Sequence, residues 1–303
     1  MRILVALGGN ALLRRGQPAD AATQRRNVEA AVEQLAILAA EHEVVLTHGN
    51  GPQVGLLALQ SESYAEVPPY PLDLLDAESD GMVGHLLEVA LRNALPGRDV
   101  VTVLTEVVVD RADPAFAAPS KPIGPVYDAE EAKRLSDERG WTIGMDGEGF
   151  RRLVPSPEPA GIPELRSLRL LIEHEVLVIC AGGGIPVALE PDGSVAGVEA
   201  VVDKDLTAAL LARRLDADLL LLLTDVDAIR LGWGGEEERP LDDADPATLR
   251  GLGLAAGSMG PKAEAASRFV EATGRRAAIG SLTEAARIVA GAAGTQVRPL
   301  AVA

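Results

Sequence analysis

A run of five consecutive leucines, residues 219–223, constrains the fold of this chain more than any other feature. A strand with one solvated face would alternate apolar and polar residues, and an amphipathic helix would show a polar stripe. An unbroken apolar run instead indicates a strand that is buried on both faces. Such strands belong to parallel sheets that carry helices on both sides. The run therefore predicts an α/β fold around a mostly parallel central sheet.

The remainder of the chain alternates between strand and helix signals, as such a sheet requires. Short apolar or β-branched runs predict strands at residues 3–7, 43–47, 100–109, 176–180, 218–223 and 277–280. Apolar residues at helical spacing predict helices at residues 27–40, 84–94, 163–173, 204–215, 261–272 and 282–290. We therefore expect a three-layer αβα sandwich.

Residues 110–159 interrupt the alternation. This stretch is rich in proline and glycine and carries only short strand and helix signals. Because it is too long for a plain loop, we interpret it as a small protruding lid. The lid would be inserted into a single domain of residues 1–303, between an N-terminal part of residues 1–109 and a C-terminal part of residues 160–303.

The composition argues against several classes of protein. Asp and Glu number 45 against 28 Lys and Arg, a net charge of −17, which disfavours binding to nucleic acid or to an anionic membrane surface. Cys180 is the only cysteine and lies in an apolar run, so we expect a buried, inert thiol and no disulfide. No apolar stretch reaches the ~18 residues of a membrane span, and residues 1–9 do not resemble a signal peptide. We expect a cytoplasmic protein.

Three glycine-rich loops follow three predicted strands: Gly8-Gly9-Asn10, His48-Gly49-Asn50-Gly51 and Gly182-Gly183-Gly184. In a parallel sheet, the loops at the carboxyl ends of the strands line one crevice. Glycines allow backbone N–H groups to approach an anion closely, and a following helix N-terminus adds a favourable dipole. None of the loops fits the P-loop or dinucleotide fingerprint. The loops therefore predict an anion site of another kind.

The chain has only four lysines, and three of them lie at element boundaries in motifs rich in glycine, proline or aspartate. These three are Lys121, Lys204 and Lys262. A lysine ammonium is a compact, mobile charge that suits a migrating phosphoryl group, whose transfer needs alignment and charge cancellation. Asp205, next to Lys204, is a candidate for organising the lysines through ion pairs.

Acidic residues follow the leucine run, at Asp225 and Asp227. Side chains at this point are placed to accept hydrogen bonds from a ribose or to approach Mg²⁺, and equally to cap a helix or form a turn. The sequence alone leaves both readings open.

The histidines indicate no metal site, because His42, His85 and His174 lack metal-ligand spacing. His48, within the second glycine loop, is a candidate for packing at the substrate site. Ser258 lies outside any G-x-S-x-G elbow, so a hydrolase triad is not supported.

Taken jointly, these motifs resemble the carbamate kinases of the amino acid kinase superfamily. The segments that carry the resemblance are residues 8–12, 48–55, 121–125, 151–157, 197–205, 224–227 and 257–262. They occur in the expected order over nearly the whole chain. The resemblance implies a three-layer fold with a lid, a homodimer, and reversible Mg²⁺-dependent phosphoryl transfer between ATP and carbamate, giving ADP and carbamoyl phosphate. Such enzymes make ATP in nitrogen catabolism, for example in arginine metabolism.

The resemblance also implies roles for individual residues. Carbamate and the moving phosphate would contact Gly8, Gly9, Asn10, Gly49, Asn50 and Gly51, with His48 packed beside them. Lys204 and Lys262 would stabilise the transition state, Asp205 would organise them, and Lys121 would reach in from the lid. ATP or ADP would contact Gly183, Asp225, Val226, Ser258, Met259 and Lys262. Mg²⁺ would be held mainly by the nucleotide phosphates. Residues 1–109 would thus form the carbamate side and residues 160–303 the nucleotide side.

One segment departs from the family pattern. Residues 75–82 carry acidic side chains where many relatives resemble Met-Ser-Gln, among them Glu78 and Asp80. We expect a surface variation. If the segment instead borders the substrate site, the added negative charge would alter affinity or substrate choice.

Two other functions remain open at this point. The chain would act on N-acetylglutamate, another amino acid or UMP if its pocket held a carboxylate-binding arginine. It would be a non-catalytic sensor of nucleotide or carbamoyl phosphate if key lysines were lost, but Lys204 and Lys262 are both present.

Overall fold

The computed structural model describes residues 1–13, 16–64, 66–147, 149–232, 234–235, 237–255 and 259–300, without the side chains of residues 10 and 11. In this part of the chain the central sheet has eight strands, and neighbouring strands are parallel except β15 and β16. The order across the sheet is β14 (Asp243–Ala244), β16 (Thr295–Val297), β15 (Arg276–Ser281), β11 (Leu219–Thr224), β1 (Arg2–Leu7), β2 (Glu43–His48), β8 (Leu177–Cys180) and β3 (Val100–Val103).

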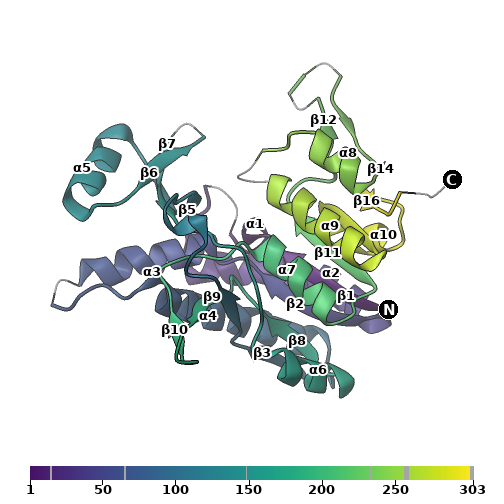
Figure 1. The fold of residues 1–303 in the computed structure, drawn as a ribbon. Coiled ribbons are helices and arrows are strands. Elements are labelled where there is room, and N and C mark those ends of the chain that lie inside the picture. Colours follow the sequence, from purple (N-terminus) through teal and green to yellow (C-terminus); the bar gives the residue numbers. More distant parts are fainter. Residues whose placement is uncertain are drawn as a thin grey trace.

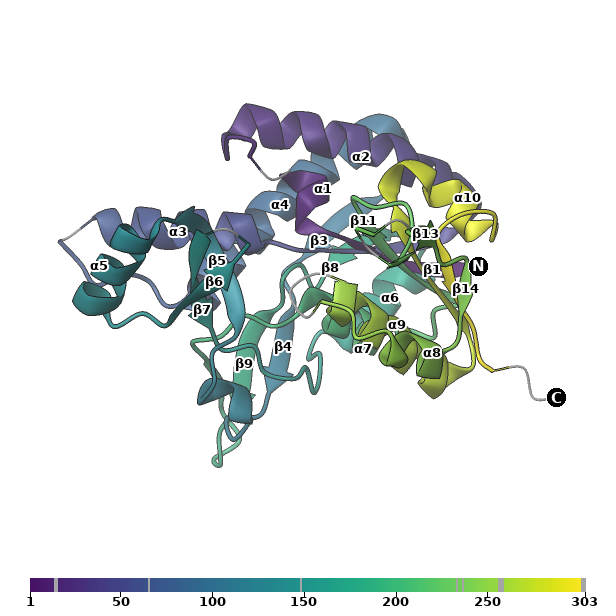
Figure 2. The ribbon, with the colours of Figure 1, turned by 90° about the horizontal axis from the view of Figure 1, so that it is seen from above.

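Helices cover both faces of this sheet, as Figures 1 and 2 show. In β11, Leu220 and Leu222 point to one face and Leu219, Leu221 and Leu223 to the other. The first face packs against α6 (Leu165–Glu173), α7 (Lys204–Arg214), α8 (Pro246–Gly251) and α9 (Met259–Thr273). The second packs against α2 (Ala21–Glu41), α4 (Leu72–Ala94) and α10 (Ala285–Val289). The leucine run is buried on both faces, and the predicted αβα sandwich is confirmed.

Residues 100–109 form two strands, so the prediction of one long strand is wrong. β3 ends at Val103, and β4 (Glu106–Val109) starts a second sheet with β9 (Ile185–Leu189) and β10 (Val195–Gly197). Between them, the buried Thr105 hydroxyl donates to the Val103 carbonyl at 2.7 Å, which closes a local turn. The side-chain pattern of the two strands carries no sign of this break.

One long helix was not predicted, and two others begin earlier than predicted. The residues after the second glycine loop form α3 (Gly51–Ser63), α2 begins at Ala21 rather than near residue 27, and α4 begins at Leu72 rather than near residue 84. The first half of α4 escaped detection because Asp76, Ser79 and Asp80 occupy buried positions where the helical pattern calls for apolar residues.

A small antiparallel sheet protrudes from the body beside α3 (Figure 1). It consists of β5 (Lys121–Tyr127), β7 (Gly149–Val154) and β6 (Ile143–Asp146), with α5 (Ala129–Arg139) against it. We call residues 121–154 the lid. The short helix η1 (Pro114–Phe116) precedes the lid, so the separate sheet occupies only the centre of the predicted insertion. The division of the chain into functional parts remains a prediction.

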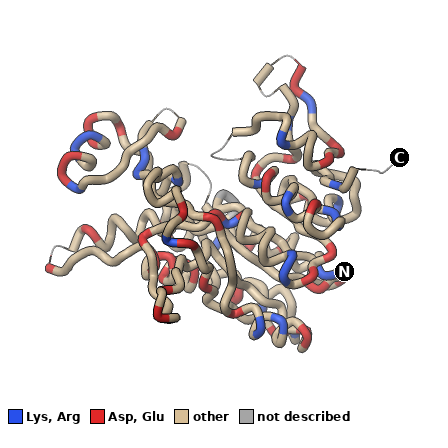
Figure 3. The backbone as a smooth tube through the Cα atoms, in the orientation of Figure 1, with Lys and Arg blue, Asp and Glu red and all other residues tan. Residues whose placement is uncertain are grey.

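The other short elements are α1 (Gly9–Leu12), η2 (Leu282–Glu284) and a hairpin of β12 (Arg230–Leu231) with β13 (Arg239–Pro240). Acidic and basic residues are interspersed over the body and the lid, and α5 carries both signs (Figure 3). Among the described residues, no helix combines the length and apolar character that crossing a membrane would need.

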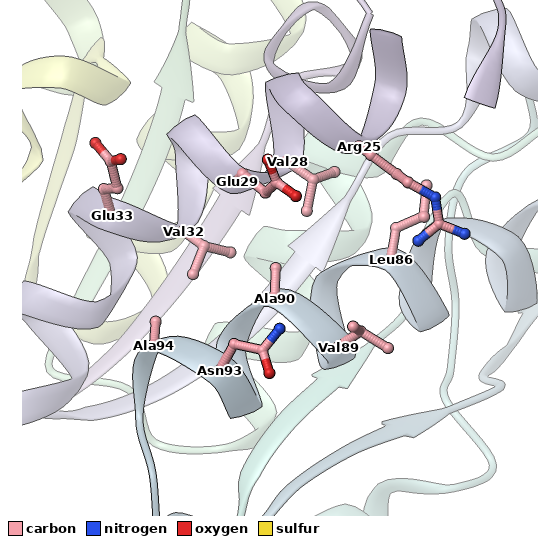
Figure 4. Close-up of a pocket in the computed structure, with 10 residues that line it drawn as sticks. All are labelled: Arg25, Val28, Glu29, Val32, Glu33, Leu86, Val89, Ala90, Asn93 and Ala94. Atoms are coloured by element: carbon pink, nitrogen blue, oxygen red, sulfur yellow. The ribbon is translucent and has the colours of Figure 1, made fainter. Parts of the chain in front are cut away.

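A groove of about 370 Å³ lies between α2 and α4. Its walls combine apolar side chains such as Val28 and Leu86 with the charged Arg25 and Glu29 (Figure 4). None of the residues predicted to bind substrate or nucleotide lines this groove.

Two glycines of α4 offer a matched test of packing against the sheet. A methyl group at Gly84 would lie 2.2 Å from Cγ2 of Thr102, whereas one at Gly81 would meet only Leu104 Cδ2 at 4.0 Å. We expect Gly84→Ala to destabilise the protein by about 1–3 kcal/mol through overpacking. Gly81→Ala should stabilise it by about 0.4–1 kcal/mol by restricting the unfolded chain. Urea denaturation of both variants would contradict this account if their free energies of unfolding changed alike.

Candidate active site

The three predicted glycine loops lie side by side at the carboxyl edge of the central sheet. Each is joined to a neighbouring strand or loop by one backbone hydrogen bond. The N–H of Gly8 donates to Leu223 O at 3.0 Å, that of Gly49 to Leu7 O at 3.0 Å, and that of Gly183 to His48 O at 2.8 Å. The order of β11, β1, β2 and β8 in the sheet thus brings together segments that are far apart in the sequence.

Helix N-termini gather at the same edge. α1 begins at Gly9, α3 at Gly51 and α7 at Lys204. A methyl group at Gly9 would contact Pro52 at 3.4 Å, and one at Gly49 would lie 3.0 Å from Cδ of Lys204, so the three helix starts adjoin. The first N–H groups of a helix have no partner within it and carry a partial positive charge. Because Gly8 and Gly49 donate within the sheet, an anion here would be met by the N–H groups at the starts of α1 and α3.

One buried carboxylate joins two of the predicted lysines. Oδ1 of Asp205 lies 2.5 Å from Nζ of Lys204, and Oδ2 lies 3.2 Å from Nζ of Lys262. Burial by itself would raise the pKa of Asp205, but the two ammonium groups outweigh burial and lower that pKa to about 2. Burial lowers the pKa of Lys204, and Asp205 opposes this shift. Asp205 is therefore ionised and holds the tips of both lysines at one point.

Asp203 links this centre to the lid. Its Oδ1 accepts hydrogen bonds from the N–H groups of Asp205 and Leu206 at 2.9 and 3.2 Å, which caps α7. Its Oδ2 forms an ion pair with Nζ of Lys121. All three motif lysines therefore lie within one network. The fourth lysine, Lys133, is exposed on α5 and pairs with Asp137.

The lid rests on α3 through a contact between two glycines. A methyl group at Gly55 would lie 2.1 Å from Cα of Gly124, whose φ is +74°. Charged groups surround this contact. Arg139 and Arg152 of the lid pair with Glu62 of α3, and both guanidinium groups lie over the ring of Trp141, at 5.3 and 4.6 Å from its centroid. These contacts fix how far the lid carries Lys121 toward the body.

A buried polar cluster lies beneath the second and third loops. Asn50 Nδ2 donates to Oδ1 of Asp76 at 2.9 Å and to Oγ of Ser79 at 2.8 Å. Nε2 of His48 lies 3.2 Å from Oδ1 of Asp80. All five side chains are at most 2% exposed. The expectation of a surface variation in residues 75–82 is therefore wrong for Asp76 and Asp80 and holds only for the exposed Glu78.

Burial, reinforced by the nearby Asp80, raises the pKa of Asp76 well above its ordinary value, although the hydrogen bond from Asn50 opposes the shift. Cys180 is also buried, as the sequence led us to expect, and burial raises the pKa of its thiol.

The residues predicted to bind nucleotide are spread over two places. Asp225 and Val226 follow β11, and Met259 begins α9, three residues before Lys262. Gly183 instead follows β8 and is buried against Asn50, since a methyl group there would lie 2.3 Å from the Asn50 amide. Ser258 and the side chain of Asn10 lie outside the described residues.

Asp203, Asp76 and Asp80 were missed as candidates from the sequence. Asp203 directly precedes Lys204 and occupies an N-cap position, which is a usable signal. Asp76 and Asp80 continue the buried stripe of α4, whose residues are Leu72, Leu75, Asp76, Ser79, Asp80 and Val83. Polar residues in a stripe of that spacing indicate a buried polar cluster.

Comparisons with known proteins give the family of the whole chain. The profile of the Amino acid kinase family matches residues 1–281. The carbamate kinase of Haemophilus influenzae is 52% identical over 299 residues, covering 98% of this chain and 96% of that protein. The carbamate kinase from Giardia lamblia bound to citric acid is 40% identical, with a TM-score of 0.92 and 98% of each chain covered. Its structure bound to AMP-PNP, also 40% identical, gives a TM-score of 0.89 with 98% of each chain covered.

The raised pKa of Asp76 has a measurable consequence for stability. The folded state binds the Asp76 proton more tightly than the unfolded state does. The protonated side chain therefore contributes to the free energy of unfolding at low pH, and this contribution is lost as the pH rises through the folded-state pKa. Asp76→Asn keeps an acceptor for Asn50 and cannot ionise. We expect the variant to be more stable than the parent chain, with a gap in free energy of unfolding that widens as the pH rises above the ordinary pKa of an aspartate. Exposed Glu78→Gln is the control, and a gap independent of pH would contradict the assignment.

The glycine contact under the lid gives a second prediction. Gly55→Ala forces the backbone of Gly124 to move, so β5 should shift and draw Lys121 away from Asp203. Hydrogen exchange of residues 121–127 should then become faster, while exchange in β11 should not change. Gly81→Ala serves as the control because its methyl group makes only ordinary contacts. Unchanged exchange in the lid of Gly55→Ala would show that the contact does not set the position of the lid.

Proposed function

The chain belongs to the carbamate kinases of the amino acid kinase family, and from this we propose that it transfers a phosphoryl group reversibly between ATP and carbamate. The products of transfer from ATP to carbamate are ADP and carbamoyl phosphate. Carbamoyl phosphate is a mixed anhydride of high transfer potential, so we expect net flux toward ATP.

The observation that carries this proposal is the pairing of Lys204 and Lys262 through Asp205. Two ammonium groups face one carboxylate, which leaves one positive charge to be balanced by a ligand next to the helix N-termini. A phosphoryl group in transfer carries negative charge on its equatorial oxygens and needs such fixed cations. The lysine tips, held by Asp205, meet that need without rearrangement.

The acceptor requires little further chemistry. Carbamate is already an anion, so one of its oxygens attacks the phosphorus without losing a proton and needs no general base. This agrees with the position of His48, whose side chain is buried beneath the glycine loops. The loops then act by binding and orienting carbamate through backbone N–H groups.

We propose that Mg²⁺ enters this site together with the nucleotide. Asp205 is engaged by two lysines and Asp203 by Lys121 and the start of α7. Across the described residues, no group of three His, Cys, Asp or Glu side chains is arranged to hold a metal ion. We therefore propose that nucleotide phosphates supply most of the Mg²⁺ ligands. When bound, the ion would neutralise charge on those phosphates.

The nucleotide is proposed to lie over β11 and α9. Asp225 and Val226 follow β11, Met259 begins the helix that carries Lys262, and the Giardia lamblia carbamate kinase is known bound to AMP-PNP. Gly183 lies on the side of β2 and β8, so we assign it to the support of the carbamate loops.

The lid completes the site. Lys121 reaches Asp203 from the lid and brings a third ammonium group toward the reacting phosphate. Closure of the lid would exclude water, which protects carbamoyl phosphate from hydrolysis. A homodimer, a cytoplasmic location and a role in arginine metabolism remain predictions.

The proposal is tested by the synthesis of ATP from ADP and carbamoyl phosphate with Mg²⁺, followed in a coupled assay. We expect the parent chain to be active. Lys204→Ala and Lys262→Ala should each lower kcat by about a hundredfold or more, because each removes charge that stabilises the transition state. The control is Lys133→Ala, which removes an exposed lysine of the lid and should keep kcat within about twofold.

Three outcomes would contradict parts of this account. Folded protein without activity would refute the proposed reaction, and nucleotide binding without turnover would favour a sensor. Near-normal kcat in Lys204→Ala or Lys262→Ala would refute the assigned roles of these lysines.

A further inference from the structure

The proposed reaction assigns no role to two buried side chains, those of His48 and Asp80. His48 and Asp80 are 0% and 1% exposed, and Nε2 of the ring lies 3.2 Å from Oδ1 of the carboxylate. The contact lacks the angles of a hydrogen bond. Within the described part of the chain, neither ring nitrogen of His48 and neither carboxylate oxygen of Asp80 has another hydrogen-bond partner.

Such a pair is costly for stability. A buried polar group without a hydrogen bond costs about 1–3 kcal/mol. The pair therefore does not serve as a strong source of stability, and its position indicates another role.

The third glycine loop packs directly against His48 and Asp80. A methyl group at Gly182 would lie 2.1 Å from Oδ1 of Asp80 and 2.2 Å from Nε2 of His48. Gly182 therefore lies directly over the contact between the two side chains, where no larger residue would fit. The next residue, Gly183, rests on the amide of Asn50 and donates its N–H to the carbonyl of His48.

The second glycine loop packs in turn against Lys204, which we propose to be catalytic. Gly49 follows His48 directly, and its Cα faces the stem of Lys204, where a methyl group would lie 3.0 Å from Cδ. A continuous set of contacts therefore runs from Asp80 on α4 through His48 and Gly49 to Lys204 and Asp205 on α7.

We propose that His48 and Asp80 are a positioning pair. They fix the distance between the second glycine loop and Lys204 and so align carbamate with the phosphoryl group. This role rests on the proposed function. It concerns the carbamate side alone, because the pair lies among β2, β8 and α4, whereas the residues assigned to nucleotide lie at β11 and α9.

The test compares Asp80→Asn, His48→Gln and the double variant with the parent chain. A change in this pair should displace the loop by a fraction of an ångström. Misplacement on that scale lowers kcat/KM for carbamoyl phosphate by about tenfold to a hundredfold. The KM for ADP should stay within about twofold, because the nucleotide side keeps its contacts. Glu78→Gln, which makes the matching carboxylate-to-amide change at an exposed residue two positions away on the same helix, should leave both constants unchanged.

The double variant tests whether the two side chains act together. Partners in one pair show losses that do not add, so the double variant should be no worse than the poorer single variant. It also removes both partners together, so neither is left buried without the other, and it serves if a single variant fails to fold. Additive losses would overturn the idea of a pair, and equal losses in KM for both substrates would indicate a merely structural role.

A second measurement does not depend on turnover. Hydrogen exchange of residues 47–51 should be faster in Asp80→Asn than in the parent chain, and exchange of residues 219–224 should be unchanged. If the parent chain fails to make ATP, the proposed function fails, and the exchange data still judge the positioning. If the parent chain is active while Asp80→Asn has normal kinetics and normal exchange, the positioning pair is refuted.

Discussion

The site depends on a single carboxylate that neutralises two lysines. Without Asp205, the ammonium groups of Lys204 and Lys262 would repel each other in a region where both side chains are almost wholly buried. The pairing also fixes the starts of α7 and α9 relative to each other, and small alanine side chains let these two helices pack closely behind it. Burial alone would raise the pKa of Asp205. That pKa is lowered because the charges of Lys204 and Lys262 have the larger effect.

The sheet decides which residues can meet this centre. Because β1 lies between β11 and β2, the first glycine loop adjoins both the proposed nucleotide side and the proposed carbamate side. α4 contacts the second loop through Asp76 and Asp80, and Lys121 of the lid contacts the start of α7 through Asp203. These parts approach closely because glycines stand at positions 49, 55, 182 and 183, where a side chain would clash with the neighbouring part.

Local sequence patterns predicted the layers and the converging lysines well, since the leucine run and the helix-start motifs are determined by near neighbours. They failed where the outcome depends on distant partners. Nothing in residues 100–109 indicates that Val103 and Glu106 join different sheets. The acidic residues of α4 looked like surface residues because their partners, Asn50 and His48, lie more than 25 positions away in the chain. Likewise, the glycine-rich motif of Gly183 did not indicate that this residue would lie against the amide of Asn50.

Asp203 serves two partners with separate oxygens, and this has a consequence for the catalytic cycle. One oxygen caps α7 and the other receives Lys121. If the lid lifted, water would replace the ammonium group of Lys121 on the second oxygen, while the first would keep its backbone hydrogen bonds. In the proposed reaction, product release would then break one ion pair without fraying the helix that carries Lys204. The lid would open and close while Lys204 and Lys262 kept their places on Asp205.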